Sequence, residues 1–166
     1  RYVARLARLD TDAPGAGGAA AAIDPEPPLP ALRRPALEAV ALACGAAPDP
    51  STLRFEPLQV ADPGPGEVEI AVEAAGLNFR DVMTVTGVLP GERTRLGVEC
   101  AGVVTRVGRD AAAIVAPGDP TGARAWEVGD RVVALAPGSF ATRVVTDGRL
   151  LAPWPDSLDA GAAASV

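Results

Sequence analysis

EVEIAVEAAGLNFRDVMTVTGVLPG, residues 67–91, is the stretch that decides the fold predicted for this chain. Its first part, Glu67–Glu73, largely alternates apolar and acidic residues, the period-two pattern of a strand with one face on a core and the other in water. The face expected in water carries Glu67, Glu69 and Glu73, and the core face carries Val68, Ile70 and Val72. A half-buried antiparallel strand is the simplest interpretation.

The polar residues that follow this strand predict a short helix. Asn78 can accept hydrogen bonds from the free backbone N–H groups of a starting helix, and Asp81 adds negative charge to its first turn. We expect the helix to run from about Phe79 to Val85. Gly87 can adopt the left-handed conformation just beyond it, and Pro90–Gly91 then prevents the helix from resuming.

Short strands at regular spacing are predicted over most of the following chain, as well as just before this stretch. They lie within residues 51–60, 99–107, 128–135, 138–147 and 149–154, which are bounded mainly by Gly, Pro or Asp. Gly102 marks a bulge or a close approach of two backbones. Arg109–Trp126 is expected to form an exposed loop. Strands at this spacing favour a β-barrel or a β-sandwich.

The two ends of the chain differ in composition from this region. Residues 1–9 form a short segment, and residues 10–34 are rich in Pro, Ala and Gly, as in a linker. Residues 35–155 are expected to form one domain. Residues 156–166 are expected to begin a helix capped by Asp156 or Ser157.

Pro35–Cys44, PALEAVALAC, is ambiguous. Its Ala, Leu and Glu residues favour a helix, with Pro35 at the first position and Gly45 as the stop. The segment is nevertheless short for a helix.

The composition limits the classes of function. All 15 basic residues are arginine, and with 21 acidic residues the net charge is −6. Since no basic stripe with interleaved aromatic residues is visible, neither nucleic acid nor an anionic membrane is an expected partner. No apolar run approaches the roughly 20 residues of a membrane span, and a cytoplasmic location is the default. Cys44 and Cys100 lack the spacing of a disulfide framework and are interpreted as buried free thiols.

The residue types also limit the chemistry. Without His or Lys the chain supplies no imidazole base, no Ser-His-Asp triad and no Schiff-base amine. Two distant cysteines and scattered acids do not form a zinc site. A Gly-rich run at residues 15–19 lies in linker composition, so no dinucleotide-binding fingerprint is predicted. Composition and spacing alone reach only a mainly β domain with one polar turn.

Three motifs carry a more specific resemblance. AAGLNFRDVMTVTGVLPGE (residues 74–92), LGVECAGVVTRVG (96–108) and VGDRVVALAPGSFATRVVTD (128–147) resemble, in order, the enoyl reductase domain of modular polyketide synthases. This zinc-independent, quinone-oxidoreductase-like group belongs to the medium-chain dehydrogenase/reductase superfamily. The resemblance implies a mainly β fold, a GroES-like, partly open β-barrel with short helices, and it implies that the family's following Rossmann domain is absent from this chain.

The resemblance also implies an activity. Enoyl reductases transfer hydride from NADPH to the β-carbon of an α,β-unsaturated acyl thioester held on an acyl carrier protein, and the α-carbon is then protonated. This chain would be the substrate-binding part, inactive alone, with ketoreductase and dehydratase domains as neighbours. RYVARL (residues 1–6) resembles the last strand of a ketoreductase structural subdomain. The alternatives are part of a free-standing quinone oxidoreductase and a non-catalytic GroES-like interaction module.

By the same resemblance, site residues can be placed on the motifs, although no catalytic residue is assigned. The cofactor contacts are Asn78, Arg80 and Asp81, and the substrate contacts are Phe79, Leu89 and Phe140. Asn78 and Val98 stand where zinc-dependent relatives place Cys and His ligands, which implies reduction without a metal.

Alternatives stay open for several of these residues. Asn78 and Asp81 could serve only as helix caps, and Phe79 is favoured as a core residue over a substrate wall. Arg80 could pair with Glu99, face the cofactor or lie free on the surface. Ser139 and Phe140 are expected in a turn near the cleft.

Leu89 departs from the family pattern. Many members have Tyr at this position, in YPG, and the family associates it with the configuration of an α-methyl branch. Leu has no hydroxyl group to donate a proton or orient water. We therefore expect either the opposite methyl configuration or a substrate without a branch.

Overall fold

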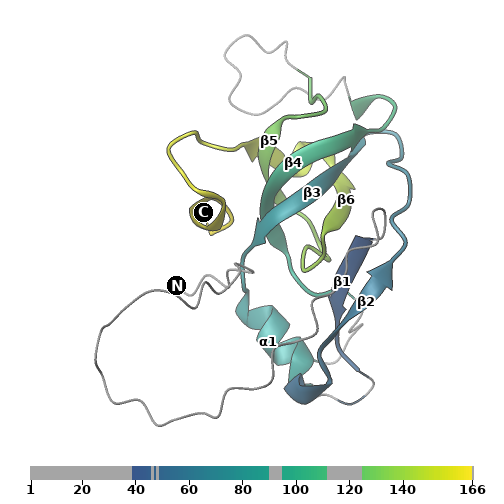
Figure 1. Cartoon of the computed structure of the whole chain (residues 1–166), viewed down its shortest axis with the longest axis vertical. Helices are drawn as coiled ribbons and strands as arrows, with labels where there is room; N and C mark the ends of the chain where they lie inside the picture. The colour runs from purple at the N-terminus through teal and green to yellow at the C-terminus, as the bar shows by residue number, and fades with distance from the viewer. Residues whose placement is uncertain (1–38, 46, 48, 90–94, 112–124, 166) are drawn as a thin grey trace, which may run out of the picture.

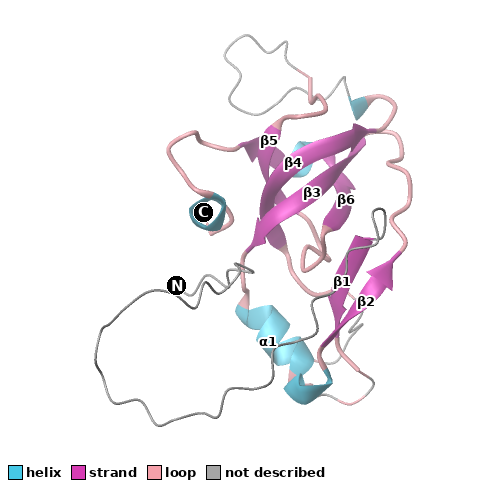
Figure 2. Ribbon diagram, viewed as in Figure 1, coloured by secondary structure: helices cyan, strands magenta, loops and turns pink. Residues whose placement is uncertain are grey.

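A computed structural model describes residues 39–45, 47, 49–89, 95–111 and 125–165 of the chain. Within these ranges the fold is mainly β (Figures 1 and 2), with a two-stranded sheet in the order β1-β2 and a five-stranded sheet in the order β6-β3-β4-β5-β7. Among the described strands every pair is antiparallel and the sheets do not close. The predicted mainly β, partly open fold with short helices is therefore confirmed.

The elements follow one another at short spacing. In chain order they are β1 (Ala39–Ala43), the 3₁₀ turn η1 (Pro50–Thr52), β2 (Arg54–Leu58), β3 (Glu67–Ala75), α1 (Phe79–Val85), β4 (Glu99–Val107), β5 (Arg131–Leu135), β6 (Arg143–Asp147), the 3₁₀ turn η3 (Gly148–Leu150), β7 (Leu151–Pro153) and α2 (Ala160–Ala163). The expected segments 1–9 and 10–34 and most of the expected loop Arg109–Trp126 lie outside the described residues.

The strand predicted at Glu67–Glu73 is present as β3, but one of its side chains differs from the prediction in its burial. Glu69 was expected in water, yet it is fully buried. Glu69 still lies on the face opposite to the core residues Val68 and Ile70, because the residue skipped at the register shift between β3 and β4 is Thr105 of β4. Arginines on the two neighbouring strands then lie within reach of the carboxylate.

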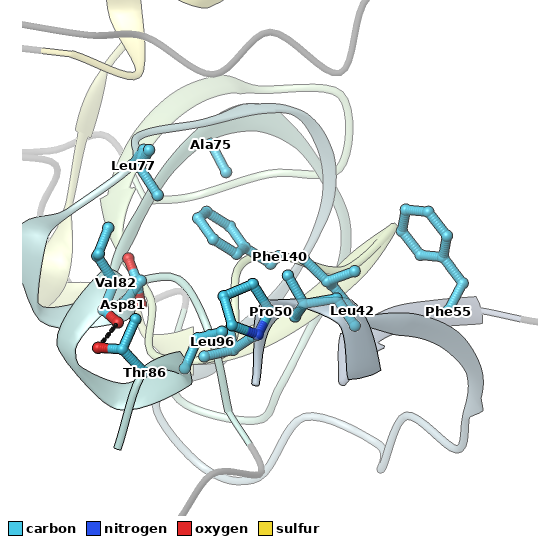
Figure 3. A pocket seen from close by; sticks show the side chains of 12 residues that line it. Leu42, Pro50, Phe55, Ala75, Leu77, Asp81, Val82, Thr86, Leu96 and Phe140 are labelled. Carbon is cyan, nitrogen blue, oxygen red and sulfur yellow. Dashed lines mark hydrogen bonds between the residues drawn. The ribbon is translucent and has the colours of Figure 1, made fainter. Parts of the chain in front are cut away.

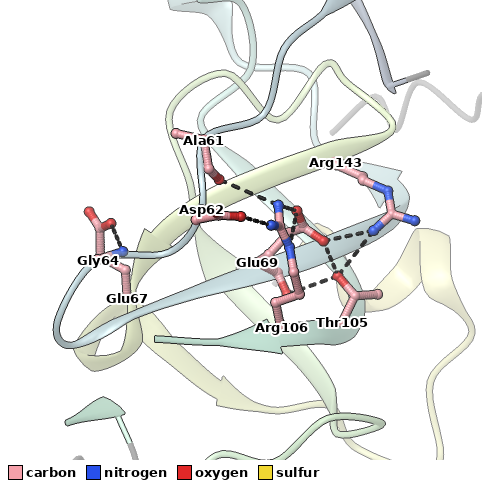
Figure 4. Close-up of polar contacts among 8 residues, drawn as sticks. All are labelled: Ala61, Asp62, Gly64, Glu67, Glu69, Thr105, Arg106 and Arg143. Atoms are coloured by element: carbon pink, nitrogen blue, oxygen red, sulfur yellow. Dashed lines mark hydrogen bonds and ion pairs between the residues drawn. The ribbon is translucent and has the colours of Figure 1, made fainter. Parts of the chain in front are cut away.

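These arginines explain why a carboxylate is stable in the sheet (Figure 4). Arg106 donates to Glu69 through Nε at 2.9 Å and also through Nη2, Arg143 donates through Nη1 at 2.7 Å, and the Thr105 hydroxyl lies 2.5 Å away. Burial disfavours the ionised form of Glu69, but these hydrogen bonds outweigh it and lower the pKa to about 2. Glu69 is therefore an ionised buried group.

Gly102 allows β4 to lie close to β3. A Cβ atom at this position would stand 2.2 Å from the backbone carbonyl oxygen of Ala71, closer than side chains tolerate. The predicted close approach of two backbones is confirmed, and it brings the two central strands together above the core.

The helix favoured for Pro35–Cys44 is wrong in the part that the structure describes. Ala39–Ala43 forms the strand β1, which pairs with β2 and bridges to Ala141 next to β6. The backbone N–H of Leu42 donates to the carbonyl of Phe140 at 2.7 Å. Pairing on both sides of the segment overrides the helix preference of its Ala and Leu residues.

Two predictions near the end of the chain also need correction. The last helix is capped by Asp159, whose Oδ1 accepts from the N–H of Ala162 at 2.8 Å, and neither Asp156 nor Ser157 caps it. Trp126 was placed in an exposed loop but is buried, with its indole N–H donating to the carbonyl of Gly148 at 2.9 Å. The large apolar area of the indole ring favours burial, although the surrounding sequence had predicted an exposed loop.

The main core lies on one face of the five-stranded sheet. Its buried members are Val68, Ile70, Ala75, Cys100, Val104, Ala111, Trp126, Val132, Ala134, Ala136, Val144 and Leu151. Burial raises the pKa of the Cys100 thiol to about 12, so the interpretation of this cysteine as a buried free thiol is confirmed. Cys44 is free but only half-buried. None of the described helices has the length and apolar character needed to cross a membrane.

Candidate functional site

Asn78 begins helix α1, as the sequence predicts. Its side-chain Oδ1 accepts a hydrogen bond from the backbone N–H of Arg80 at 2.9 Å, and its own backbone N–H donates to Oδ2 of Asp81 at 3.1 Å. Gly87 follows the last turn with a φ of 75°, a conformation that glycine adopts without strain. The predicted cap, helix and glycine stop are confirmed, whereas Pro90–Gly91 lies outside the described residues.

Asp81 connects this helix to the segment before β4. The carboxylate is buried, and its Oδ1 accepts from the backbone N–H of Gly97 at 2.9 Å. Gly97 has a φ of 87°, and a Cβ atom there would lie 2.5 Å from the backbone nitrogen of Phe140. Three segments distant in sequence therefore meet around one carboxylate and one glycine.

A cavity of about 330 Å³ opens beside this junction (Figure 3). It is lined by Leu42, Pro50, Leu53, Phe55, Ala75, Leu77, Asp81, Val82, Val85, Thr86, Leu96 and Phe140. Most of these side chains are apolar. The Thr86 hydroxyl donates to the carbonyl of Val82 at 2.8 Å, and both oxygens of Asp81 accept backbone N–H groups. The cavity thus suits an apolar group rather than a charged one.

The predicted site residues occupy two different positions relative to this cavity. Asp81 and Phe140 line it together, although they are far apart in sequence. Asn78, Phe79 and Arg80 instead lie exposed at the start of α1.

The structure contradicts one interpretation of Phe79. Its side chain is 71% exposed, so its assignment to the core was wrong. Exposure of so large a ring is compatible with a contact to another molecule.

The remaining predicted residues are placed as follows. Leu89 is half-buried, with its backbone N–H donating to the carbonyl of Met83 at 3.1 Å, and it is not among the residues that line the cavity. Ser139 is buried and donates through Oγ to the carbonyl of Glu99 at 3.1 Å, which fixes the turn that carries Phe140. The turn near the cleft is therefore confirmed.

The β1–β2 hairpin supplies a wall that sequence reasoning missed. Leu42 of β1 and Phe55 of β2 face α1 across the cavity (Figure 3), and Leu53, which follows η1, also lines it. Phe55 is 43% exposed and Leu53 is 37% exposed. The near alternation of apolar residues from Leu53 onward was a signal for a strand, but it carried no information about which cavity that strand lines.

The exposed polar groups at the start of α1 are accessible to another molecule. The guanidinium of Arg80 makes no ion pair with Glu99 and no hydrogen bond to any described residue. The Asn78 side chain is likewise exposed. Cationic and amide groups of this kind suit phosphate oxygens and a carboxamide. In the described ranges, no three His, Cys, Asp or Glu side chains come together in a way that could hold a metal ion.

Comparison with known proteins places this geometry in context. The profile of the alcohol dehydrogenase GroES-like domain matches residues 64–156. The pikromycin polyketide synthase component PikAII of Streptomyces venezuelae is 41% identical over 145 residues, which are 86% of this chain and 3% of that protein. The chain spans 2% to 5% of the length of eight curated polyketide synthase relatives that it matches.

Two solved structures share the fold. The CurK enoyl reductase has a TM-score of 0.66 at 27% identity, with 77% of this chain and 39% of that chain covered. The mycobacterial protein Rv1454c complexed with NADPH has a TM-score of 0.61 at 32% identity, with 77% of this chain and 36% of that chain covered.

Proposed function

Because the chain belongs to the alcohol dehydrogenase GroES-like domain family, we propose that it forms the substrate-binding part of an enoyl reductase within a polyketide synthase. The substrate is an α,β-unsaturated acyl thioester carried on an acyl carrier protein. The apolar cavity between α1, the β1–β2 hairpin and Phe140 is the observation that carries this proposal, because it can hold an acyl chain beside exposed polar groups.

The proposed division of the chain follows from the same assignment. Residues 35–155 are the substrate-binding domain and residues 156–166 lead toward a nucleotide-binding domain. Residues 1–9 end a ketoreductase structural subdomain, and residues 10–34 are a linker. Ketoreductase and dehydratase domains are then neighbours in the same synthase, and the location is cytoplasmic.

Each site residue receives a separate task. The cavity wall, including Phe140, excludes water from the acyl chain and orients it. Asn78 and Arg80 present their exposed side chains to NADPH, which supplies hydride for the β-carbon when bound. Asp81 holds the start of α1 against Gly97 and thereby fixes the direction of these two side chains. Exposed Phe79 and half-buried Leu89 extend the substrate surface beyond the cavity.

Turnover of a simple enoyl thioester tests the proposal. The complete synthase that carries this chain is supplied with crotonyl-pantetheine and NADPH, and the loss of NADPH absorbance and the formation of butyryl-pantetheine are measured. We expect one NADPH to be oxidised per butyryl product. The matched variant Phe140→Ala should raise KM, because it removes an apolar wall of the cavity, while Phe55, which also lines the cavity, remains.

A quinone is the competing substrate. Structures of quinone oxidoreductases also share the fold, at 30% identity and a TM-score of 0.62 for a mycobacterial example. If the synthase oxidises NADPH with a small quinone but leaves the enoyl thioester unchanged, the enoyl reductase proposal is wrong. If it oxidises NADPH with neither acceptor while its other domains are active, the non-catalytic interaction module is favoured instead.

A further inference from the structure

A second cavity, of about 350 Å³, lies between the β1–β2 hairpin and β6. Its lining differs from that of the apolar cavity because it includes two arginines, Arg95 and Arg143, and the amide side chain of Gln59, and none of the described lining residues is acidic. Leu42 and Leu96 line both cavities, so the two cavities lie on either side of these leucines. A ligand that extends past these two leucines could reach both cavities.

Arg95 is placed against this cavity by a glycine. A Cβ atom at Gly138 would lie 3.2 Å from Nε of Arg95, so the arginine side chain lies along the bare glycine backbone. Gly138 has a φ of 91° and its N–H donates to the carbonyl of Gly97 at 2.9 Å, which fixes the turn under the arginine. The Arg95 guanidinium makes no hydrogen bond or ion pair with any described residue. It is therefore free to bind an anion.

Arg143 adds positive charge to the same wall. Its Nη1 donates to Glu69 at 2.7 Å and weakly to Thr105 at 3.4 Å, whereas no described residue accepts from its Nε or Nη2. The polar network around it contains two arginines, Arg106 and Arg143, and two acids, Glu69 and Asp62, which balance at 2 − 2 = 0. Arg95 then leaves the region with a charge of +1, although the whole chain carries −6.

We propose that this second cavity binds the phosphate of the phosphopantetheine arm that carries the acyl thioester. This inference rests on the proposed function, since it assumes that the acyl chain occupies the neighbouring apolar cavity. The guanidinium of Arg95, which no described residue pairs, and the Nε and Nη2 groups of Arg143 suit a phosphate, and Leu58, Val60 and Val144 suit the apolar part of the arm. The phosphate anchors the arm while the acyl end is directed past Leu42 and Leu96.

The test compares thioesters with and without the phosphate. The complete synthase is assayed with crotonyl-phosphopantetheine and with crotonyl-pantetheine, as wild type and as Arg95→Gln. The control is Arg149→Gln, because Arg149 is also exposed but pairs with Asp147 elsewhere on the surface. A charged hydrogen bond of ordinary strength predicts that Arg95→Gln raises KM for the phosphorylated substrate about tenfold and leaves kcat unchanged.

Each outcome decides the inference. A KM increase confined to the phosphorylated substrate, and absent from Arg149→Gln, supports the phosphate site. An equal effect of Arg95→Gln on both substrates, or no effect on either, overturns it, while continued reduction of crotonyl-pantetheine leaves the proposed function standing. If the wild type reduces neither thioester, the proposed function itself fails and the inference falls with it.

A second measurement covers the case in which Arg95→Gln does not fold. In the wild type, raising the ionic strength should increase KM for crotonyl-phosphopantetheine more than KM for crotonyl-pantetheine, because salt screens an exposed charge pair. Identical salt dependence for the two substrates would also overturn the phosphate site.

Discussion

Glu69 is a buried carboxylate held by arginines from the two strands that flank β3. Its side chain is 1% exposed, while those of Arg106 and Arg143 are 40% and 46% exposed. The negative charge is therefore buried in the sheet, whereas the side chains that carry the two positive charges remain partly in water. Removing the carboxylate would leave Arg143 without an acidic partner and Arg106 with Asp62 alone, although both arginines can still reach solvent.

Glu69→Gln should therefore reduce the free energy of unfolding by about 2 kcal/mol, the cost of losing a charged hydrogen-bond acceptor. Urea unfolding followed by circular dichroism measures this change. The control is Glu56→Gln, which removes an exposed partner of Arg54 and should change stability by less than about 1 kcal/mol. Equal effects of the two substitutions would show that burial of Glu69 contributes nothing.

The acid sensitivity of folding gives a second test of the same residue. The pKa of Glu69 is lowered in the folded state to about 2 from its ordinary value of 4.5, so the unfolded chain binds a proton first. The stabilising contribution is complete above about pH 4.5 and is lost as the pH falls toward about 2. Glu69→Gln should flatten this part of the stability profile. A profile as steep as that of the wild type would contradict the assignment.

Leu89 tests substrate choice at the scale of one side chain. Since leucine has no hydroxyl group to donate a proton or orient water, we expect the wild-type product to be unbranched or to have the methyl configuration opposite to that of members with Tyr. Leu89→Tyr in the complete synthase should change the configuration of a branched product, measured by chiral chromatography. Leu89→Met is the matched control, and an unchanged configuration in Leu89→Tyr would refute the role.

At the scale of elements, Gly102 sets the separation of β3 and β4. Gly102→Ala places a methyl group 2.2 Å from a backbone carbonyl, which no rotamer can relieve, so the strands must move apart. We expect a loss of about 3 kcal/mol in unfolding free energy, at the upper end of the cost of overpacking. Gly64→Ala is the control, because its new methyl group meets only the flexible end of Glu67. Comparable stability of the two variants would contradict the close approach.

The elements also show what the sequence could and could not predict. β3, α1 and β4 were predictable because alternation, a capping residue and a glycine stop act locally along the chain. The structure of β1 was not, since Ala39–Ala43 has helix-forming residues and becomes a strand only through pairing with β2 and contacts to Phe140 and Thr142. Burial of Glu69 depended likewise on arginines 37 and 74 positions away in sequence.

The residues of the candidate site also divide into those that the sequence could predict and those that it could not. Asn78, Asp81 and the turn at Phe140 could be predicted from local motifs and from the family resemblance. The hairpin wall formed by Leu53 and Phe55, and the placement of Arg95 beside Gly138, could not, because they arise from contacts between distant segments. Sequence patterns predict which residues form an element, but they do not predict the cavity that two elements enclose.

At the scale of the whole molecule, cofactor affinity tests the division of tasks along the chain. The match to the NADPH-complexed relative covers only 36% of that protein. The exposed cation at the start of α1 is Arg80, on a helix of 7 residues, and a single exposed ion pair contributes less than about 1 kcal/mol. The described residues include no glycine-rich strand–turn–helix loop that could hold phosphates.

We therefore expect the 166-residue chain to bind NADPH weakly, with no saturation at low micromolar cofactor, in a titration followed by NADPH fluorescence. The complete synthase should bind more tightly, and Arg80→Gln in that protein should weaken NADPH binding severalfold while the exposed control Arg54→Gln does not. Submicromolar binding by the isolated chain would show that its own residues hold the phosphates. In that case the cofactor site would have to be sought among the arginines of this chain rather than in a separate nucleotide-binding domain.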